Sequence, residues 1–250
     1  MEEISFENRY GEKLAGVISK NNDSDIIVVI CHGFVGNMNI NFFQELLENL
    51  NENNFNVLKF DFAGNGESEG EIGDASYLKE REDLDSVLNQ LEEKGFKKFC
   101  LVGHSMGGGV SIMTASEDQR VKWIVDIAAP AYPNRIKDYW FGEEKVKEAL
   151  TKGQTTIKTK RYEFIFNKKF FVDLEKADIK GSIKKVKVPL LIIQGTSDER
   201  VSLEESEELF ILANNPKTMQ IISGADHCFI GKEGDLFATI INWCLKWIKE

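Results

Sequence analysis

The stretch KFCLVGHSMGGG, residues 98–109, sets an apolar run directly before Gly-His-Ser-Met-Gly. Residues 98–102 are typical of a buried β-strand, and the sequence after the serine is typical of a helix start. A G-x-S-x-G sequence between a strand and a helix predicts a sharp, strained turn, because small residues at Gly103 and Gly107 leave room for it. The turn presents the Ser105 hydroxyl at a helix N-terminus, which favours developing negative charge. Ser105 is therefore the predicted nucleophile.

A serine hydroxyl is a weak nucleophile and needs a base within hydrogen-bond reach. Where such a turn carries the nucleophile, the chain order is Ser, then Asp or Glu, then His. The chain has three histidines, His32, His104 and His227, and only His227 follows Ser105. It stands in Gly-Ala-Asp-His, a predicted loop after the last strand. His227 is therefore the predicted general base.

The acid that orients such a base is expected in a loop after a late strand. Asp198 follows the apolar run PLLIIQG, residues 189–195, and is the predicted acid. Three rivals are weaker. Asp126 falls inside a predicted strand, Glu199 should point away from its neighbour, and Asp226 is too close to His227 in the chain to reach its ring.

Acyl transfer also needs backbone N–H donors for the oxyanion. The residue after the nucleophile supplies one, here Met106, and the loop after an earlier strand supplies the other. His32-Gly33-Phe34 directly follows the apolar run IIVVIC, so the Phe34 N–H is the second predicted donor. Gly33 permits a close backbone approach. We interpret His32 as a structural residue that holds this loop.

Apolar strand patterns alternate with helical patterns along most of the chain. Strands are predicted at residues 14–19, 26–31, 55–62, 98–102, 121–128, 189–195 and 218–222, and helices at 39–51, 74–94, 202–212 and 235–248. The first of these strands is expected at a sheet edge. The alternation predicts an α/β fold, with a mostly parallel central sheet and helices on both faces.

Residues 131–187 interrupt this alternation and are too long for a plain loop. We expect them to form a small cap over the carboxyl edge of the sheet, with residues 1–130 and 188–250 as the core. Aromatic residues are concentrated there: Tyr132, Tyr139, Trp140, Phe141, Tyr162, Phe164, Phe166, Phe170 and Phe171. Some should seat the cap on the core and others should line an apolar cleft, which favours uncharged acyl or aryl groups.

The composition disfavours a nucleic-acid-binding, membrane-spanning or zinc-binding protein. The 250 residues carry a formal net charge of -10, which disfavours binding to nucleic acid. No apolar run approaches the roughly 18 residues that span a bilayer, and the acidic start does not resemble a secretory signal. The four cysteines lack the paired spacing of a zinc site. We expect a cytoplasmic protein that needs no metal or cofactor; the sequence does not indicate an oligomeric state.

Five motifs occur in an order that resembles the α/β-hydrolase superfamily over essentially the whole chain. They are HGF (32–34), DFAGNGES (61–68), GHSMGG (103–108), GTSDERV (195–201) and GADHCF (224–229). Within the superfamily the chain is most similar to bacterial carboxylesterases of the feruloyl/cinnamoyl esterase type, which also carry an HGF loop and a compact cap. Such esterases often have Gln where this chain has Met106. Monoacylglycerol lipases and serine aminopeptidases share the GHSMGG form.

The resemblance implies a serine carboxylic-ester hydrolase that acts through an acyl-enzyme. Small to medium acyl or aryl esters are the expected substrates, feruloyl and cinnamoyl esters among them. A peptidase or amidase, a monoacylglycerol lipase and a thioesterase of the same fold remain alternatives. A non-catalytic binding protein is a further alternative, although such proteins usually lack one of the three reacting residues.

Overall fold

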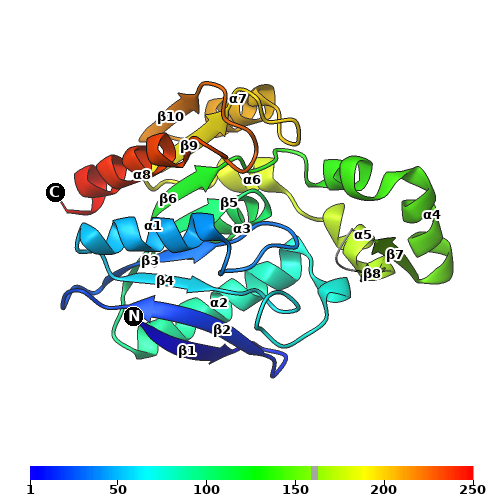
Figure 1. Ribbon diagram of the computed structural model, residues 1–250, viewed down its shortest axis with the longest axis horizontal. Coiled ribbons are helices and arrows are strands. Elements are labelled where there is room, and N and C mark those ends of the chain that lie inside the picture. Colours follow the sequence, from blue (N-terminus) through cyan, green and yellow to red (C-terminus); the bar gives the residue numbers. More distant parts are fainter. Residues whose placement is uncertain (159–162, 250) are drawn as a thin grey trace.

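The computed structural model describes residues 1–158 and 163–249, which form an eight-stranded sheet covered by helices (Figure 1). The strands lie in the order β1-β2-β4-β3-β5-β6-β9-β10. Their bounds are β1 Glu2–Glu7, β2 Lys13–Ser19, β3 Ile26–Cys31, β4 Val57–Phe60, β5 Lys98–His104, β6 Val121–Ile127, β9 Leu190–Gly195 and β10 Lys217–Ile222. All pairs from β4 to β10 are parallel, and β1 and β2 are antiparallel to their neighbours. The predicted α/β class is confirmed.

The prediction that residues 14–19 form an edge strand is wrong. β2 lies between β1 and β4, and β1 is the edge of the sheet (Figure 1). The glutamates of β1 conceal a period-2 pattern in which Ile4 and Phe6 face inward, and Phe6 is 1% exposed. This alternation is typical of a strand with one buried face, and charged residues on an edge strand discourage pairing with other chains.

Two apolar cores lie on opposite faces of the sheet because successive strand residues point in opposite directions. In β3, Val28 and Ile30 pack against α1 (Asn41–Glu52) and α8 (Glu233–Ile248). Ile27 and Val29 belong to the core on the other face, which is covered by α2 (Tyr77–Glu93), α3 (Met106–Ala115) and α7 (Leu203–Leu212). No helix of the described residues is both long and apolar enough to cross a membrane.

Residues 131–187 contain a second, two-stranded antiparallel sheet that projects from one side of the main sheet (Figure 1). The segment also contains short helices, among them the 3₁₀-helix η2 and the π-helix η3. In chain order, the helices and strands of residues 131–187 are η2 Pro133–Arg135, η3 Lys137–Phe141, α4 Gly142–Lys152, β7 Gln154–Lys158, β8 Glu163–Asn167, α5 Lys168–Leu174 and α6 Ile179–Ile183. The last of them, α6, packs against α3 and α7. Tyr162, one of the aromatic residues that the sequence concentrates in this segment, lies outside the described residues.

Candidate active site

The turn between β5 and α3 is strained, as the glycine spacing predicts. Ser105 has φ 55° and ψ −119°, outside the regions that non-glycine residues favour. A Cβ on Gly103 would lie 2.3 Å from the Gly107 carbonyl oxygen, and a Cβ on Gly107 would lie 2.4 Å from the carbonyl oxygens of Cys31 and His32. The two glycines therefore let α3 begin directly against the end of β3, which places Ser105 at the carboxyl edge of the sheet.

Gly107→Ala is expected to lower the free energy of unfolding by about 1–3 kcal/mol or more, because the new methyl group would meet two backbone oxygens that cannot move without shifting β3. Gly234→Ala is the matched control. It lies in α8, where the new methyl group would have no neighbouring atom within 4 Å, so it should be neutral or slightly stabilising. Urea denaturation of both variants measures the difference, and equal stabilities would contradict the packing argument.

Ser105, His227 and Asp198 form one chain of hydrogen bonds. His227 Nε2 lies 3.0 Å from Ser105 Oγ, and His227 Nδ1 lies 2.8 Å from Asp198 Oδ2. An ionised carboxylate only accepts hydrogen bonds, so Nδ1 carries the proton and donates to Asp198. That leaves Nε2 unprotonated, able to accept the Ser105 proton. The structure thus brings together the three side chains that the sequence singles out.

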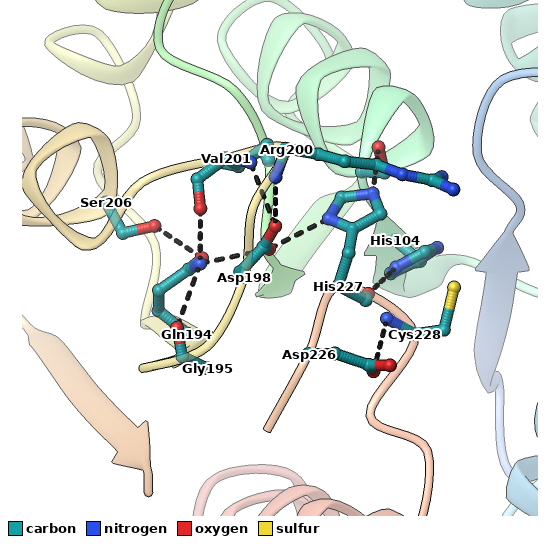
Figure 2. A network of polar contacts seen from close by, with 12 residues as sticks. His104, Gln194, Gly195, Asp198, Arg200, Val201, Ser206, Asp226, His227 and Cys228 are labelled. Carbon is teal, nitrogen blue, oxygen red and sulfur yellow. Dashed lines mark hydrogen bonds and ion pairs between the residues drawn. The ribbon is translucent and has the colours of Figure 1, made fainter. Parts of the chain in front are cut away.

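Asp198 is held ionised by four donors. Its Oδ1 accepts the backbone N–H groups of Arg200 (2.8 Å) and Val201 (2.9 Å), and its Oδ2 accepts from His227 and from Gln194 Nε2 (3.1 Å) (Figure 2). Burial opposes ionisation, but the hydrogen bond and charge of His227 and the two backbone donors outweigh it, so the pKa of Asp198 lies below its ordinary value. The carboxylate is therefore both fixed in place and negatively charged at neutral pH.

The two residues whose N–H groups are the predicted oxyanion donors belong to segments that adjoin Ser105. Met106 is the first residue of α3, and Phe34 follows the loop at the end of β3. Gly33 approaches closely enough that a Cβ there would lie 3.1 Å from the Ser105 Cβ. Within the described residues, neither the Phe34 N–H nor the Met106 N–H donates a hydrogen bond. Both N–H groups therefore lack a hydrogen-bond partner in the described part of the chain.

Ser105 opens into a pocket of about 260 Å³, here called the active-site pocket. The walls include Phe34, Ile40, Tyr139, Trp140, Arg200 and Cys228, together with His227. A second hollow of about 480 Å³, the side pocket, shares Val35, Gly36 and Trp140 with it. The side pocket also borders Gly64 to Gly66 of the DFAGNGES loop and Phe164 of the small sheet.

A large part of the chain matches a known protein family. Residues 26–166, more than half of the chain, match the family model described as alpha/beta hydrolase fold. This chain belongs to the α/β-hydrolase family. The matched region contains β3 to β6, the turn that carries Ser105, and part of residues 131–187, here called the inserted segment. Both Asp198 and His227 lie beyond the matched region.

Relatives within the family cover most of the chain at low identity. The uncharacterized protein YfhR of Escherichia coli O157:H7 is 24% identical over 98% of this chain and 80% of its own length. The mitochondrial palmitoyl-protein thioesterase ABHD10 of Rattus norvegicus is 24% identical over 72% of this chain and 61% of its own. Among solved structures, Est1E from Butyrivibrio proteoclasticus with ferulic acid bound has a TM-score of 0.86 at 20% identity, covering 99% of this chain and 100% of that one. At this identity the likeness establishes the fold.

Two further histidines of this α/β hydrolase have buried positioning contacts. His104 Nε2 donates to the carbonyl oxygen of His227 (2.8 Å) (Figure 2). Burial, and to a smaller extent the charge of His227, lowers the pKa of His104 to about 3, so its ring stays neutral. His32 Nδ1 donates to Gly33 O (2.9 Å), while its Nε2 accepts the Phe62 N–H (3.1 Å). The structural interpretation of His32 agrees with these contacts. The supporting contact of His104 was not recognised from the sequence, because it bridges residues 123 positions apart.

The three rival acids do not reach the base. Asp226 accepts the N–H groups of Cys228 and Ile230 within its own loop (both 3.0 Å), and Glu199 is exposed. Asp126 is fully buried at the end of β6, where its Oδ1 accepts the Ala129 N–H (2.9 Å). Its Oδ2 has no hydrogen-bond partner among the described residues, and burial raises the pKa of Asp126 to about 7.

Asp126→Asn should therefore change the pH dependence of stability. Burial disfavours the ionised Asp126 in the folded state, so the wild type loses stability as pH rises from the unfolded pKa of about 4 to the folded value of about 7. The free energy of unfolding of the variant, relative to wild type, should rise by about 1.4 kcal/mol per pH unit across this range. Urea denaturation at pH 5 and pH 8 measures it, with the exposed Asp23→Asn as control. A pH-independent difference would show that Asp126 is ionised alike in both states.

Apart from Tyr132, which is exposed and donates to Glu208, the described aromatic side chains of residues 131–187 divide into two groups. Phe141, Phe166, Phe170 and Phe171 are buried in the main apolar core, and Phe34 packs among the first three of them and Trp140. Tyr139, Trp140 and Phe164 line the two pockets. The Phe34 side chain thus anchors the loop after β3, whose Phe34 N–H is a predicted oxyanion donor, against residues 131–187.

Proposed function

We propose that this protein is a serine carboxylic-ester hydrolase that works through an acyl-enzyme. The observation that carries the proposal is the hydrogen-bonded chain from Ser105 through His227 to Asp198, whose serine faces a pocket. No other described residue offers a nucleophile in contact with a base in that pocket. The proposed substrates are small to medium acyl or aryl esters.

The chemistry follows from the direction of the hydrogen bonds. Ser105 Oγ attacks the ester carbonyl while His227 Nε2 takes its proton, and the Phe34 and Met106 N–H groups stabilise the oxyanion. The C–O bond to the alcohol then breaks, and the alcohol leaves with the proton from His227. Water, activated by the same base, next attacks the acyl-enzyme and releases the carboxylic acid and free Ser105. Asp198 stabilises the imidazolium that forms in both steps.

We also propose that residues 131–187 act as the cap that sets specificity. The support is the position of Tyr139, Trp140 and Phe164 in the pocket walls. Aromatic walls suit acyl or aryl groups, and pockets for small molecules are usually lined in this way. Ferulic acid bound to Est1E, a protein of the same fold, supports including feruloyl and cinnamoyl esters in the test.

Two measurements test the proposal. A fluorophosphonate probe should label the native protein at Ser105 and should not label Ser105→Ala. A hydrolysis panel of p-nitrophenyl acetate, p-nitrophenyl butyrate, methyl ferulate, acyl thioesters and aminoacyl amides should then show esters cleaved with the highest kcat/KM. Thioesters are the second candidate class, because one relative is named a palmitoyl-protein thioesterase. Absence of labelling in the folded native protein would contradict a serine hydrolase of any specificity.

A further inference from the structure

The active-site pocket contains an unpaired positive charge. Arg200 lines this pocket with Ser105 and His227, and Figure 2 shows its side chain extending past the His227 ring. Among the lining residues in the described part of the chain, Arg200 is the only Arg, Lys, Asp or Glu. Acidic residues outnumber basic ones in the chain by 41 to 31, yet the described wall of this pocket has one guanidinium and no carboxylate.

Arg200 differs from the other arginines that the structure describes. Each of the other four has a carboxylate partner: Arg9 with Glu82, Arg81 with Glu117, Arg120 with Asp118, and Arg135 with Glu205. The Arg200 guanidinium makes no hydrogen bond or ion pair with any described residue, and only its backbone N–H is used, to hold Asp198. The nearby carboxylate of Asp198 already accepts four hydrogen bonds, so it leaves the guanidinium free.

The active-site pocket also contains a second free donor. Tyr139 comes from η3 of the inserted segment and lines the same pocket, and its hydroxyl has no hydrogen-bond partner among the described residues. Burial raises the pKa of Tyr139 to about 12; the charge of Arg200 opposes that rise, and the charges of Glu205 and Asp198 add to it. The Tyr139 hydroxyl therefore stays protonated and able to donate.

We propose that Arg200 and Tyr139 form a subsite for a carboxylate group of the ester substrate. A guanidinium presents a planar fork of N–H donors that matches the two oxygens of a carboxylate, and a phenol O–H adds a third donor. Arg200 is exposed and Tyr139 is 42% exposed in the pocket wall, so both donors are accessible to a ligand. The substrate class is an ester that carries a free carboxylate near the scissile bond, rather than the wholly uncharged esters that an apolar cleft favours.

This inference rests on the proposed ester hydrolysis, and its test compares matched esters. One pair carries the charge on the alcohol side, 4-acetoxybenzoate against methyl 4-acetoxybenzoate. The other carries it on the acyl side, mono-p-nitrophenyl adipate against its methyl ester. The quantity measured is the ratio of kcat/KM for the charged ester to kcat/KM for its neutral partner, so that a general effect of a mutation on the chemical step cancels.

Arg200→Gln should lower this ratio about 10- to 100-fold for at least one pair, because a charge-assisted hydrogen bond is lost. Tyr139→Phe should lower the ratio for the same pair by about 2- to 10-fold, since one neutral donor is lost. Arg9→Gln is the matched control: it removes the same charge from the chain at a side chain paired with Glu82, outside the pocket, and should leave the ratio unchanged.

An unchanged ratio for both pairs in Arg200→Gln, with the neutral esters still cleaved by the wild type, would overturn the carboxylate subsite and leave the esterase intact. An equal fall in Arg9→Gln would also overturn it, because the effect would then belong to net charge. Failure of the native protein to cleave any of the four esters and to react with the fluorophosphonate probe would instead contradict the proposed function itself.

Discussion

Replacement of Ser105 by alanine is expected to lower kcat/KM for ester hydrolysis by at least about 10³-fold. The hydroxyl is the group that forms the acyl-enzyme, so its loss removes the covalent path and leaves only the weak catalysis of bound water. The fold should be retained. Alanine has no greater difficulty than serine with the positive φ of residue 105, and within the described residues the hydroxyl forms a hydrogen bond only with His227.

The kinetic measurement needs two companions. Circular dichroism and urea denaturation of Ser105→Ala should match the wild type, which excludes unfolding as the cause. Adding His227→Ala to Ser105→Ala should cost little further activity, because residues that act as a unit have non-additive effects. Turnover near the wild-type level in Ser105→Ala would show that another group is the nucleophile.

Asp198→Asn should lower kcat by up to about 10⁴-fold through the tautomer of His227. Asp198 Oδ1 accepts two backbone N–H groups, so the asparagine oxygen should take that position and its NH₂ group should face His227 Nδ1. That NH₂ group can only donate, which places the imidazole proton on Nε2. A protonated Nε2 cannot accept the proton of Ser105.

Asp126→Asn is the matched control for this variant. It makes the same chemical change in another buried carboxyl near the carboxyl edge of the sheet, but Asp126 contacts Ala129 and not the base. It should change kcat far less than Asp198→Asn. Labelling by the fluorophosphonate probe should slow in parallel with kcat, since it depends on the same proton transfer. A larger loss from Asp126→Asn would reverse the choice of acid.

Much of the core could be predicted because local patterns encode burial. The apolar runs at β3, β5 and β9 identify strands buried on both faces, and the glycines around Ser105 identify the strained turn. Since the carboxyl ends of parallel strands share one edge, the loops bearing Asp198 and His227 could be expected beside Ser105. β1 was missed because its alternating pattern is short and its outward residues are mostly acidic, so its pairing with β2 depends on the rest of the sheet.

The side chains around the predicted reacting residues could not be placed in the same way. Local periodicity does not determine which residues from different elements meet, because that depends on how helices and loops pack across the sheet. Phe34 could be named for its backbone N–H, but its side chain packs among aromatic residues more than 100 positions away. The contact of His104 with the base loop depends likewise on tertiary packing.

The sequence by itself determined the α/β class, the strained serine turn and the order Ser105, Asp198, His227, because these depend on residue spacing within single elements and on the common edge of parallel strands. Only the tertiary structure decided that His104 supports the loop of the base, and that Arg200 and Tyr139 share the pocket wall. The physical reason is that hydrogen bonds and charge interactions act over a few ångströms. Side chains come that close only when the inserted segment packs against loops that are far away in the chain.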